Sequence, residues 1–268
     1  MTTLPTVALL APIGLEELVA RASLQTRMDR KYVLPMADVE EVLAGLARSE
    51  EVRVLDIGTR RSFGYESLYF DTPDLASYHL AARGRRRRFK VRRRTYLDSG
   101  ESFVEIKTRG GRGTTVKERA PDLGSGPYLR PDAGPAFMSD VLHRAGIAHV
   151  RCSDLRPTLR TSYRRSTLYL PASSGRVTID TDLTWSLPGQ PGLTLDGLAI
   201  VETKSAAGVS AADRRLWRHG HRPSRISKYG TGLAALRAEL PANKWCPVLR
   251  SHFAGALPAS TPSEWTLA

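Results

Sequence analysis

Several short segments of the chain alternate charged and apolar residues, and this period of two constrains the fold more than any other feature. In the clearest segment, RRRRFKVRRRT at residues 85–95, Phe89 and Val91 alternate with basic residues. Successive side chains of a strand point to opposite faces. The basic residues that share one face are Arg88, Lys90, Arg92 and Arg94. The segment therefore predicts a β-strand with one apolar and one cationic face.

The same alternation recurs in five further segments, which read TRMDRKYVLP, FVEIKTR, VKER, RVTIDTDL and VETKS. Their charged faces align Arg27, Asp29 and Lys31; Glu105, Lys107 and Arg109; Lys117 and Arg119; Arg176, Asp180 and Asp182; and Glu202 and Lys204. A single charged face usually lies in water. Repetition favours a shared cationic interior instead, and such an interior needs bound anions because its charges repel each other.

The remaining pattern predicts an α+β fold. Helices are expected over residues 14–23, 37–48, 136–145, 211–219 and 232–240, with a short helix before Gly84. Strands are expected over 52–57, 65–71, 86–96, 102–109, 114–120, 156–163, 167–170, 176–187 and 198–205, and a tight hairpin turn is expected at GGRG, residues 110–113. No internal repeat or linker is evident, so residues 1–268 are interpreted as one domain with less regular termini at 1–14 and 241–268.

The net charge of +13 indicates an anionic partner, such as nucleic acid, a phosphorylated small molecule, polyphosphate or an anionic membrane surface. Nucleic acid is disfavoured because only 7% of the residues are aromatic. Cys152 and Cys246 form no disulfide framework, which favours a reducing, cytoplasmic compartment. The sequence contains no signal peptide and no apolar stretch of bilayer-spanning length.

Nine segments in sequence order resemble the polyphosphate polymerase domain of the vacuolar transporter chaperone (VTC) family, of the CYTH-like triphosphate tunnel metalloenzyme superfamily. They are TRMDRKYVLP, SLYFDTPDLASY, FKVRRRTY, FVEIKTR, VKER, LRTSYRRSTLY, RVTIDTDL, VETKS and RISKYGTG. The resemblance covers roughly residues 15–240. It implies an antiparallel β-barrel of about eight strands that forms a basic tunnel, with helices packed outside.

The resemblance also implies an activity, the metal-assisted transfer of the γ-phosphate of ATP to a growing polyphosphate chain, with Mn²⁺ or Mg²⁺ as cofactor. The implied catalytic residues are Lys228, Arg92, Arg94 and Lys107. The implied phosphate-binding residues are Lys31, Arg27, Lys90, Lys117, Arg119, Arg160, Arg165, Arg176, Lys204 and Arg225, the last replacing a lysine of many members. Glu202 is the expected metal ligand and Glu105 a second candidate, although either carboxylate could instead pair with neighbouring cations.

Two other functions remain open. A tunnel triphosphatase usually begins with a Glu-x-Glu-x-Lys strand, whereas Arg27, Asp29 and Lys31 occupy these positions here, which favours the polymerase. A non-catalytic polyanion-binding module would also explain the basic charge. The run Arg85–Arg88 is either a solvated turn or a funnel that guides a polyanion. The expected partners are ATP and polyphosphate; a membrane-protein partner, whether such a partner receives the product, and the oligomeric state stay open.

Overall fold

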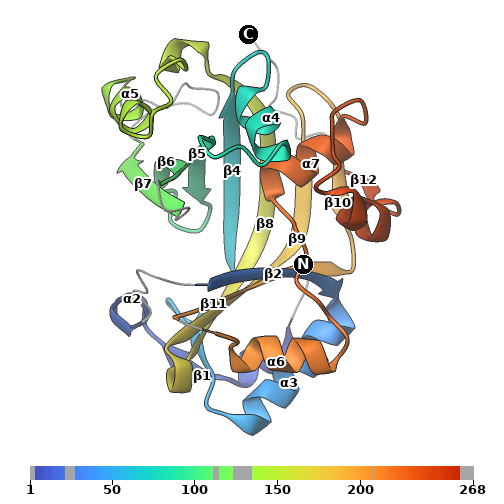
Figure 1. The fold of residues 1–268 in the computed structure, drawn as a ribbon. Coiled ribbons are helices and arrows are strands. Elements are labelled where there is room, and N and C mark those ends of the chain that lie inside the picture. The colour runs from blue at the N-terminus through green and yellow to red at the C-terminus, as the bar shows by residue number, and fades with distance from the viewer. Residues whose placement is uncertain (1–3, 22–27, 111–114, 123–134, 207, 260–268) are drawn as a thin grey trace. The chain divides into compact units, whose positions relative to one another are not determined.

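The computed structural model describes residues 4–21, 28–110, 115–122, 135–206 and 208–259 (Figure 1). Contacts between Cα atoms divide the chain into two compact units. The first unit contains Met1–Gly64, Tyr163–Leu183 and Leu195–Ile226, and the second contains Tyr65–Ser162, Thr184–Thr194 and Ser227–Ala268. Strands β8 (Arg156–Leu170) and β9 (Gly175–Ser186), joined by the 3₁₀ turn η2 (Pro171–Ser173), contribute residues to both units. Each unit is described by itself below.

The α+β class is confirmed, but the closed eight-stranded barrel is wrong. The described residues form twelve strands, hydrogen-bonded in the order β12-β10-β9-β8-β4-β5-β6-β7, with β2, β11, β1 and β3 joined off this path. Most pairs are antiparallel, and β1 with β3 is parallel. The sheet is not closed, because β12 and β7 at its two ends do not pair with each other within the described ranges.

The first unit holds a sheet region covered by two helices, α3 (Met36–Ser49) and α6 (Ala211–Arg218). Its strands include β2 (Met28–Pro35) and β11 (Leu198–Ser205), and β11 pairs with both β2 and β9. The unit also contains α1 (Pro5–Leu9), β1 (Ala11–Ile13), α2 (Leu15–Arg21) and β3 (Arg53–Leu55). The alternation of β11 turns Val201 toward the helices and Glu202 to the opposite face.

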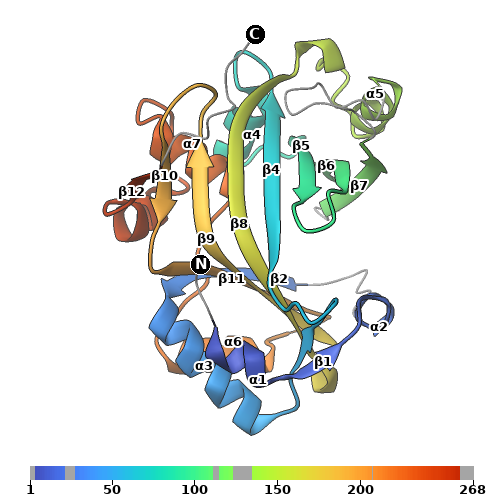
Figure 2. The same ribbon diagram turned by 180° about the vertical axis from the view of Figure 1, so that it is seen from behind.

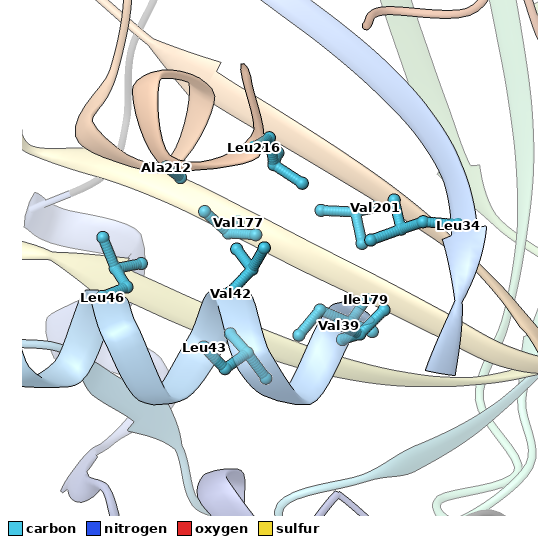
Figure 3. A pocket seen from close by; sticks show the side chains of 10 residues that line it. All are labelled: Leu34, Val39, Val42, Leu43, Leu46, Val177, Ile179, Val201, Ala212 and Leu216. Carbon is cyan, nitrogen blue, oxygen red and sulfur yellow. The ribbon is translucent and has the colours of Figure 1, made fainter. Parts of the chain in front are cut away.

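The core of this unit lies between α3, α6 and the strands. Val39, Val42 and Leu46 of α3 point toward Val177 and Val201 of the sheet (Figure 3). The cavity that these side chains leave measures about 10 Å³, at most the volume of one water molecule. The core is therefore closely packed and holds no ligand.

The second unit is built on β4 (Phe63–Asp71), β5 (Phe89–Tyr96), β6 (Ser102–Arg109) and β7 (Thr115–Pro121), which are neighbours in that order (Figure 2). Phe89, Val91, Val104 and Ile106 are buried with Met138 of α5 (Pro135–Arg144) in one apolar cluster. The remaining elements are α4 (Ala76–Ala82), η1 (Cys152–Asp154), β10 (Gly192–Leu195), α7 (Lys228–Leu236), α8 (Cys246–Val248), the π-helix η3 (Leu249–Phe253) and β12 (Leu257–Ala259). The apolar face of β5 and β6 is thus the core face, and the charged face is opposite.

Most predicted elements are confirmed, with differences at their ends. The strands expected at 156–163 and 167–170 form one long strand, β8. The helix expected at 232–240 is α7, which already begins at Lys228, and the strand expected from Arg86 begins at Phe89. Most of the expected GGRG turn lies outside the described residues, at 111–113. None of the described helices has both the length and the apolar composition required to cross a membrane.

Candidate functional site

A cationic face on β5, β6 and β7 of the second unit is the most concentrated group of charges that the sequence predicted. Strand alternation turns one set of side chains away from the core, and the register places them opposite one another. We call this set the Glu105 cluster: Lys90, Arg92, Arg94, Glu105, Lys107, Lys117 and Arg119. Arg93 points to the other face, where it pairs with Asp122 at 2.6 Å. The continuous arginine run is therefore divided between the two faces.

Glu105 is the single carboxylate on this face within the described residues of β5, β6 and β7, and it is surrounded by cations. Arg92 donates from Nε and Nη2 to Oε2 of Glu105 at 2.8 and 2.5 Å. Lys117 Nζ lies 2.5 Å from Oε1 and Arg94 Nη1 lies 3.8 Å from the same oxygen. Burial alone would raise the pKa of Glu105, but the charges of these three cations hold it well below its usual range. The carboxylate is therefore ionised at neutral pH.

The charged face of these strands is buried at Arg92, Arg94 and Glu105 and exposed at Lys117 and Arg119. Arg92 and Arg94 are each 8% exposed and Glu105 is 1% exposed. On this face the described residues of β5, β6 and β7 include six basic side chains and one carboxylate. Buried charge without a counter-ion is costly. A polyvalent anion bound at this face would offset that cost.

A row of three lysines crosses the cluster. The register places Lys90 directly opposite Lys107 and Lys107 directly opposite Lys117, where Cβ atoms are about 5 Å apart. Burial, followed by the charges of Arg92, Lys90 and Arg94, lowers the pKa of Lys107 well below its usual value. Burial also lowers the pKa of Lys117, although Glu105 opposes the shift. Like charges in direct opposition repel each other, and an anionic group between them would relieve that repulsion.

Lys90, at one end of this row, contacts the N-terminus of α7. Ser227 caps the helix, and its Oγ accepts hydrogen bonds from Gly230 N at 3.2 Å and from Lys90 Nζ at 2.9 Å. Lys228, expected to be catalytic, is the first residue of α7 and is half-buried. The structure thus brings Lys90 and Lys228 to the same helix end, where backbone N–H groups also favour anions.

Two tryptophans fix the position of α7. Trp185 donates from Nε1 to the carbonyl of Lys228 at 2.8 Å. A Cβ atom on Gly230 would lie 2.3 Å from Trp245, and one on Gly232 would lie 2.1 Å from Trp185. Only glycine allows the indole rings to approach the helix this closely. The glycines of the SKYGTG segment therefore serve the placement of Lys228.

Sequence reasoning missed the aromatic side chains of the site. Tyr69 Oη accepts a hydrogen bond from Arg92 at 3.2 Å, and Lys90 Nζ lies 5.9 Å from its ring centre. Tyr229 donates to Asp71, which also accepts from the backbone N–H groups that begin α4. The alternation of β4 could have placed Tyr69 on the cationic face, but the partners of Tyr229 lie too far along the chain to predict.

A second group of charges lies in the first unit on β2, β8, β9 and β11, and we call it the Glu202 cluster: Lys31, Arg165, Asp180, Glu202 and Lys204. Glu202 Oε1 lies 2.9 Å from Lys31 Nζ and 3.3 Å from Lys204 Nζ. Lys204 and Lys31, with Arg165, lower the pKa of Glu202 well below its usual value despite burial. Arg165 forms a bidentate salt bridge with Asp180, with N–O distances of 2.6 and 2.8 Å. Charges in this cluster are nearly balanced, in contrast to the Glu105 cluster.

Other predicted residues lie outside these contacts. Arg176 lies opposite Lys204 in the β9–β11 register. Arg119 is exposed and its guanidinium lies 4.9 Å from the ring centre of Phe103. Arg160 pairs with Glu66 at 2.9 Å, and Glu66 points to the opposite face of β4 from Tyr69, so the structure does not bring Arg160 into the Glu105 cluster. Arg225 is exposed, and Arg27 lies outside the described residues.

The two predicted metal ligands differ in how well they fit a cation. Both oxygens of Glu105 lie at basic side chains, so a divalent ion does not fit there. Oε1 of Glu202 contacts the two lysines. Oε2 is the oxygen with which Glu202 would contact a metal. No group of three or more His, Cys, Asp or Glu side chains within the described ranges could hold a metal alone. A Mg²⁺-like ion bound here would therefore take most ligands from substrate phosphates and water.

Comparison with solved structures gives weak similarities over most of the chain. A Hippeastrum adenylyl cyclase candidate, reported to have a dominant triphosphatase activity, is 15% identical, with 82% of this chain and 100% of that chain covered and a TM-score of 0.42. An adenylate cyclase candidate from Bacillus halodurans is 11% identical, with 88% and 94% covered and a TM-score of 0.42. No curated protein matches the sequence.

Comparison with protein families gives one match that covers most of the chain. The family model described as "VTC domain" matches residues 26–124 and 136–237. The matched ranges contain β2, β5, β6, β7, β11 and the beginning of α7, and so every predicted residue of both clusters. The chain belongs to the VTC domain family.

Proposed function

We propose that the protein is a polyphosphate polymerase that transfers the γ-phosphate of ATP to the end of a growing polyphosphate chain. The observation that carries the proposal is the Glu105 cluster, where six basic side chains share one face with a single carboxylate. Membership of the VTC domain family supports the same activity. ATP and polyphosphate both supply a polyvalent negative charge that would offset the cost of burying these cations.

The composition of the Glu105 cluster suits phosphoryl transfer. In this reaction an oxygen of the terminal phosphate attacks the γ-phosphorus of ATP, and the bond to the β-phosphate oxygen breaks to release ADP. The protein needs to align donor and acceptor and to neutralise the charge of the transferred group. Arg92 and Arg94 offer planar donors for phosphate oxygens, while Lys90, Lys107 and Lys228 act as compact charges.

The residues that orient Arg92 and Lys90 also belong to the second unit. Glu105 holds Arg92 by two hydrogen bonds, and Ser227 holds Lys90 beside the N-terminus of α7. Because these contacts are made within the protein, the cations are oriented before a phosphate arrives. Such preorganisation lowers the cost of stabilising charge in the transition state.

We further propose that Glu202 contributes one carboxylate oxygen to Mn²⁺ or Mg²⁺, with Lys31 and Lys204 holding its other oxygen. When bound, a divalent ion neutralises phosphate charge and polarises the donor. The proposed donor, ATP, makes the cytoplasm the expected compartment.

The first experiment incubates the purified protein with ATP and Mn²⁺ or Mg²⁺ and analyses the products on a gel. We expect long polyphosphate chains and one ADP for each phosphate incorporated. Release of orthophosphate or pyrophosphate without polymer would assign a triphosphatase instead. Binding of polyphosphate that ignores added metal, without ATP turnover, would assign a non-catalytic module.

Variants then test the residues. Arg92→Ala and Lys228→Ala should each reduce synthesis by roughly 100-fold or more, the effect of removing a donor to transition-state charge. Arg144→Ala is the matched control, because Arg144 is an exposed arginine of the same unit that pairs with Glu118 and Asp140. Equal activity of the Arg92 variant and the control would refute the assigned site.

A further inference from the structure

Asp71, the last residue of β4, is a fully buried carboxylate held by neutral hydrogen-bond donors. Its Oδ1 accepts from the backbone N of Thr72 and of Ser77, each at 2.8 Å. Its Oδ2 accepts from the backbone N of Tyr78 at 2.9 Å and from the hydroxyl of Tyr229. The backbone donors lie just before α4 and in its first turn, whereas Tyr229 is the second residue of α7. Asp71 therefore joins the start of α4 to the start of α7.

Tyr229 and Tyr69 form a pair of neighbouring buried rings, which we call the tyrosine pair. Their ring centres lie 5.1 Å apart, and the angle between the ring planes is 30°. Tyr69 precedes Asp71 by two residues on β4, so both side chains lie on the same face of the strand. Burial, followed by the charge of Asp71, raises the pKa of Tyr229 well above its usual value. Tyr229 therefore stays protonated at neutral pH and donates to Asp71.

The tyrosine pair contacts two cations of the Glu105 cluster. Lys90 Nζ lies 5.9 Å from the ring centre of Tyr69 and 5.8 Å from that of Tyr229. An ammonium group within about 6 Å of a ring centre is attracted by the electrons of the ring. Arg92 lies opposite Tyr69 in the β4–β5 register and donates from Nη1 to its hydroxyl at 3.2 Å. The pair therefore restrains the positions of both cations.

Packing alone does not explain the two hydroxyl groups of the pair. A buried hydroxyl costs free energy unless it is hydrogen-bonded, and two phenylalanines would fill the same space without that cost. The hydroxyl of Tyr69 contacts Arg92, and the hydroxyl of Tyr229 contacts Asp71. The first contact holds a cation directly, and the second fixes the ring beside which Lys90 lies. Both hydroxyl groups thus contribute to the placement of positive charge.

We propose that Asp71 and the tyrosine pair are positioning residues that hold Lys90 for the phosphates of the ligand. Asp71 acts through Tyr229, and Tyr229 acts on Lys90 through its ring. The flexible side chain of a lysine loses rotamer freedom when it is ordered, and the two rings with Ser227 order it before the ligand binds. The proposal rests on the proposed function for the identity of the ligand.

The test measures the binding of inorganic triphosphate by calorimetry, in the absence of ATP. Tyr229→Phe keeps the ring and removes the bond to Asp71, whereas Tyr229→Leu removes the ring as well. Tyr78→Phe is the matched control, because Tyr78 is a buried tyrosine of the same unit whose hydroxyl donates to the carbonyl of Pro241 at 3.2 Å. Thermal unfolding of each variant measures the loss of stability, which both phenylalanine variants should share.

We expect Tyr229→Phe to bind triphosphate roughly threefold more weakly than the wild type, and Tyr229→Leu roughly tenfold more weakly, because a hydrogen bond and then an aromatic contact to a cation are lost. Tyr78→Phe should bind triphosphate like the wild type. Asp71→Asn should weaken binding no further when it is combined with Tyr229→Phe, since both substitutions remove the same link. If Asp71→Asn does not fold, the Tyr229 variants decide the outcome.

A second comparison repeats Tyr229→Leu in the Lys90→Ala background. Because Tyr229 acts through Lys90, the substitution should then weaken triphosphate binding by less than about twofold. An undiminished loss in this background would overturn the proposal, since it would show that Tyr229 acts on another group. Wild-type affinity of Tyr229→Leu, or an equal loss in Tyr78→Phe, would overturn it as well.

Wild-type affinity of Tyr229→Phe would overturn the role of Asp71, because that variant lacks only the hydroxyl that Asp71 holds. Failure of the proposed function is distinguishable from all of these outcomes. A protein that makes no polymer but binds triphosphate would still show whether Tyr229 and Lys90 are coupled.

Discussion

Glu105 is the residue on which the charge balance of the second unit depends. It accepts two hydrogen bonds from Arg92 and forms ion pairs with Lys117 and Arg94. Its side chain is almost fully buried. The sequence offered two interpretations of this residue, a metal ligand or an ion-pair partner, and the structure supports the ion pair. The carboxylate holds the side chain of Arg92 in place through two hydrogen bonds.

Substitution of Glu105 by Gln should destabilise the ligand-free protein by about 3 kcal/mol, the cost of removing one partner from a buried ion pair. The contribution depends on pH because the folded pKa of Glu105 is depressed. Its stabilisation is complete well above about pH 4.3, the unfolded pKa of a glutamate, and is lost as pH falls toward the folded pKa. Urea unfolding at pH 7 and pH 3 measures both effects.

Glu118→Gln is the control for this prediction. Glu118 lies on the other face of β7, where it pairs with the exposed Arg144 at 2.7 Å. A surface pair of this kind contributes about 1 kcal/mol or less. Equal losses of unfolding free energy in the two variants would contradict the special role of Glu105.

Lys107 should couple phosphate binding to proton uptake. Burial and three neighbouring cations lower its pKa in the ligand-free protein, and a bound phosphate would favour its charged form. Triphosphate binding should therefore weaken as pH rises from 7 toward 10, and its calorimetric heat should depend on the ionisation enthalpy of the buffer.

The Lys107→Arg variant separates this effect from other protonation steps, since an arginine stays charged at all these pH values. It should bind triphosphate with less proton uptake than the wild type. The prediction fails if both proteins take up the same number of protons.

At the scale of elements, α7 is placed by contacts that no local pattern contains. Ser227 caps the helix and holds Lys90, while Trp185 and Trp245 pack on its two glycines. The sequence predicted a helix in this region but began it at Gly232, because a helix with Gly230 and Gly232 in its first half has low intrinsic propensity. Tertiary packing against tryptophan overrides that preference.

Ser227→Ala should therefore have two effects. Loss of the cap should lower stability by about 1 kcal/mol. Loss of the contact to Lys90 should also weaken triphosphate binding. Ser210→Ala is the matched control, because Ser210 caps α6 in the first unit and accepts from Asp213 N at 3.0 Å. Thermal unfolding and triphosphate titration of both variants measure the two effects. Equal losses of triphosphate affinity in the Ser227 and Ser210 variants would contradict a role of Ser227 in positioning Lys90.

Strand phase was the best predicted feature of the site. The period of two correctly placed Lys90, Arg92, Glu105 and Lys107 on one face, and β6 and β11 begin and end where the pattern predicted. The pattern did not predict β1, β10 or β12, which have only three or four residues each. Such segments are too short to show a period, and their pairing with distant strands decides their conformation.

At the scale of the whole molecule, the excess of positive charge destabilises the folded state through self-repulsion. The net charge is +13, and the most concentrated part of it lies on one face of β5, β6 and β7. The closed barrel could not be established from sequence, because closure depends on which edge strands pair and not on the phase of any one strand. The family itself could be recognised, since its motifs occur in order along the chain.

Triphosphate should raise the thermal stability of the protein far more than sodium chloride of equal ionic strength. A ligand at a hundred times its Kd stabilises the folded state by about 2.7 kcal/mol, whereas salt only screens the repulsion. Differential scanning fluorimetry with both additives measures the difference. Equal shifts of Tm would show that general screening, and not a specific site, relieves the repulsion.

The three facing lysines have a practical consequence for work with the protein. Closely spaced lysines attract multivalent anions from solution. We therefore expect protein purified from cells to carry inorganic phosphate or short phosphate oligomers. Its bare form would then be obtained only after deliberate stripping, and affinities measured without that step would describe exchange of one anion for another.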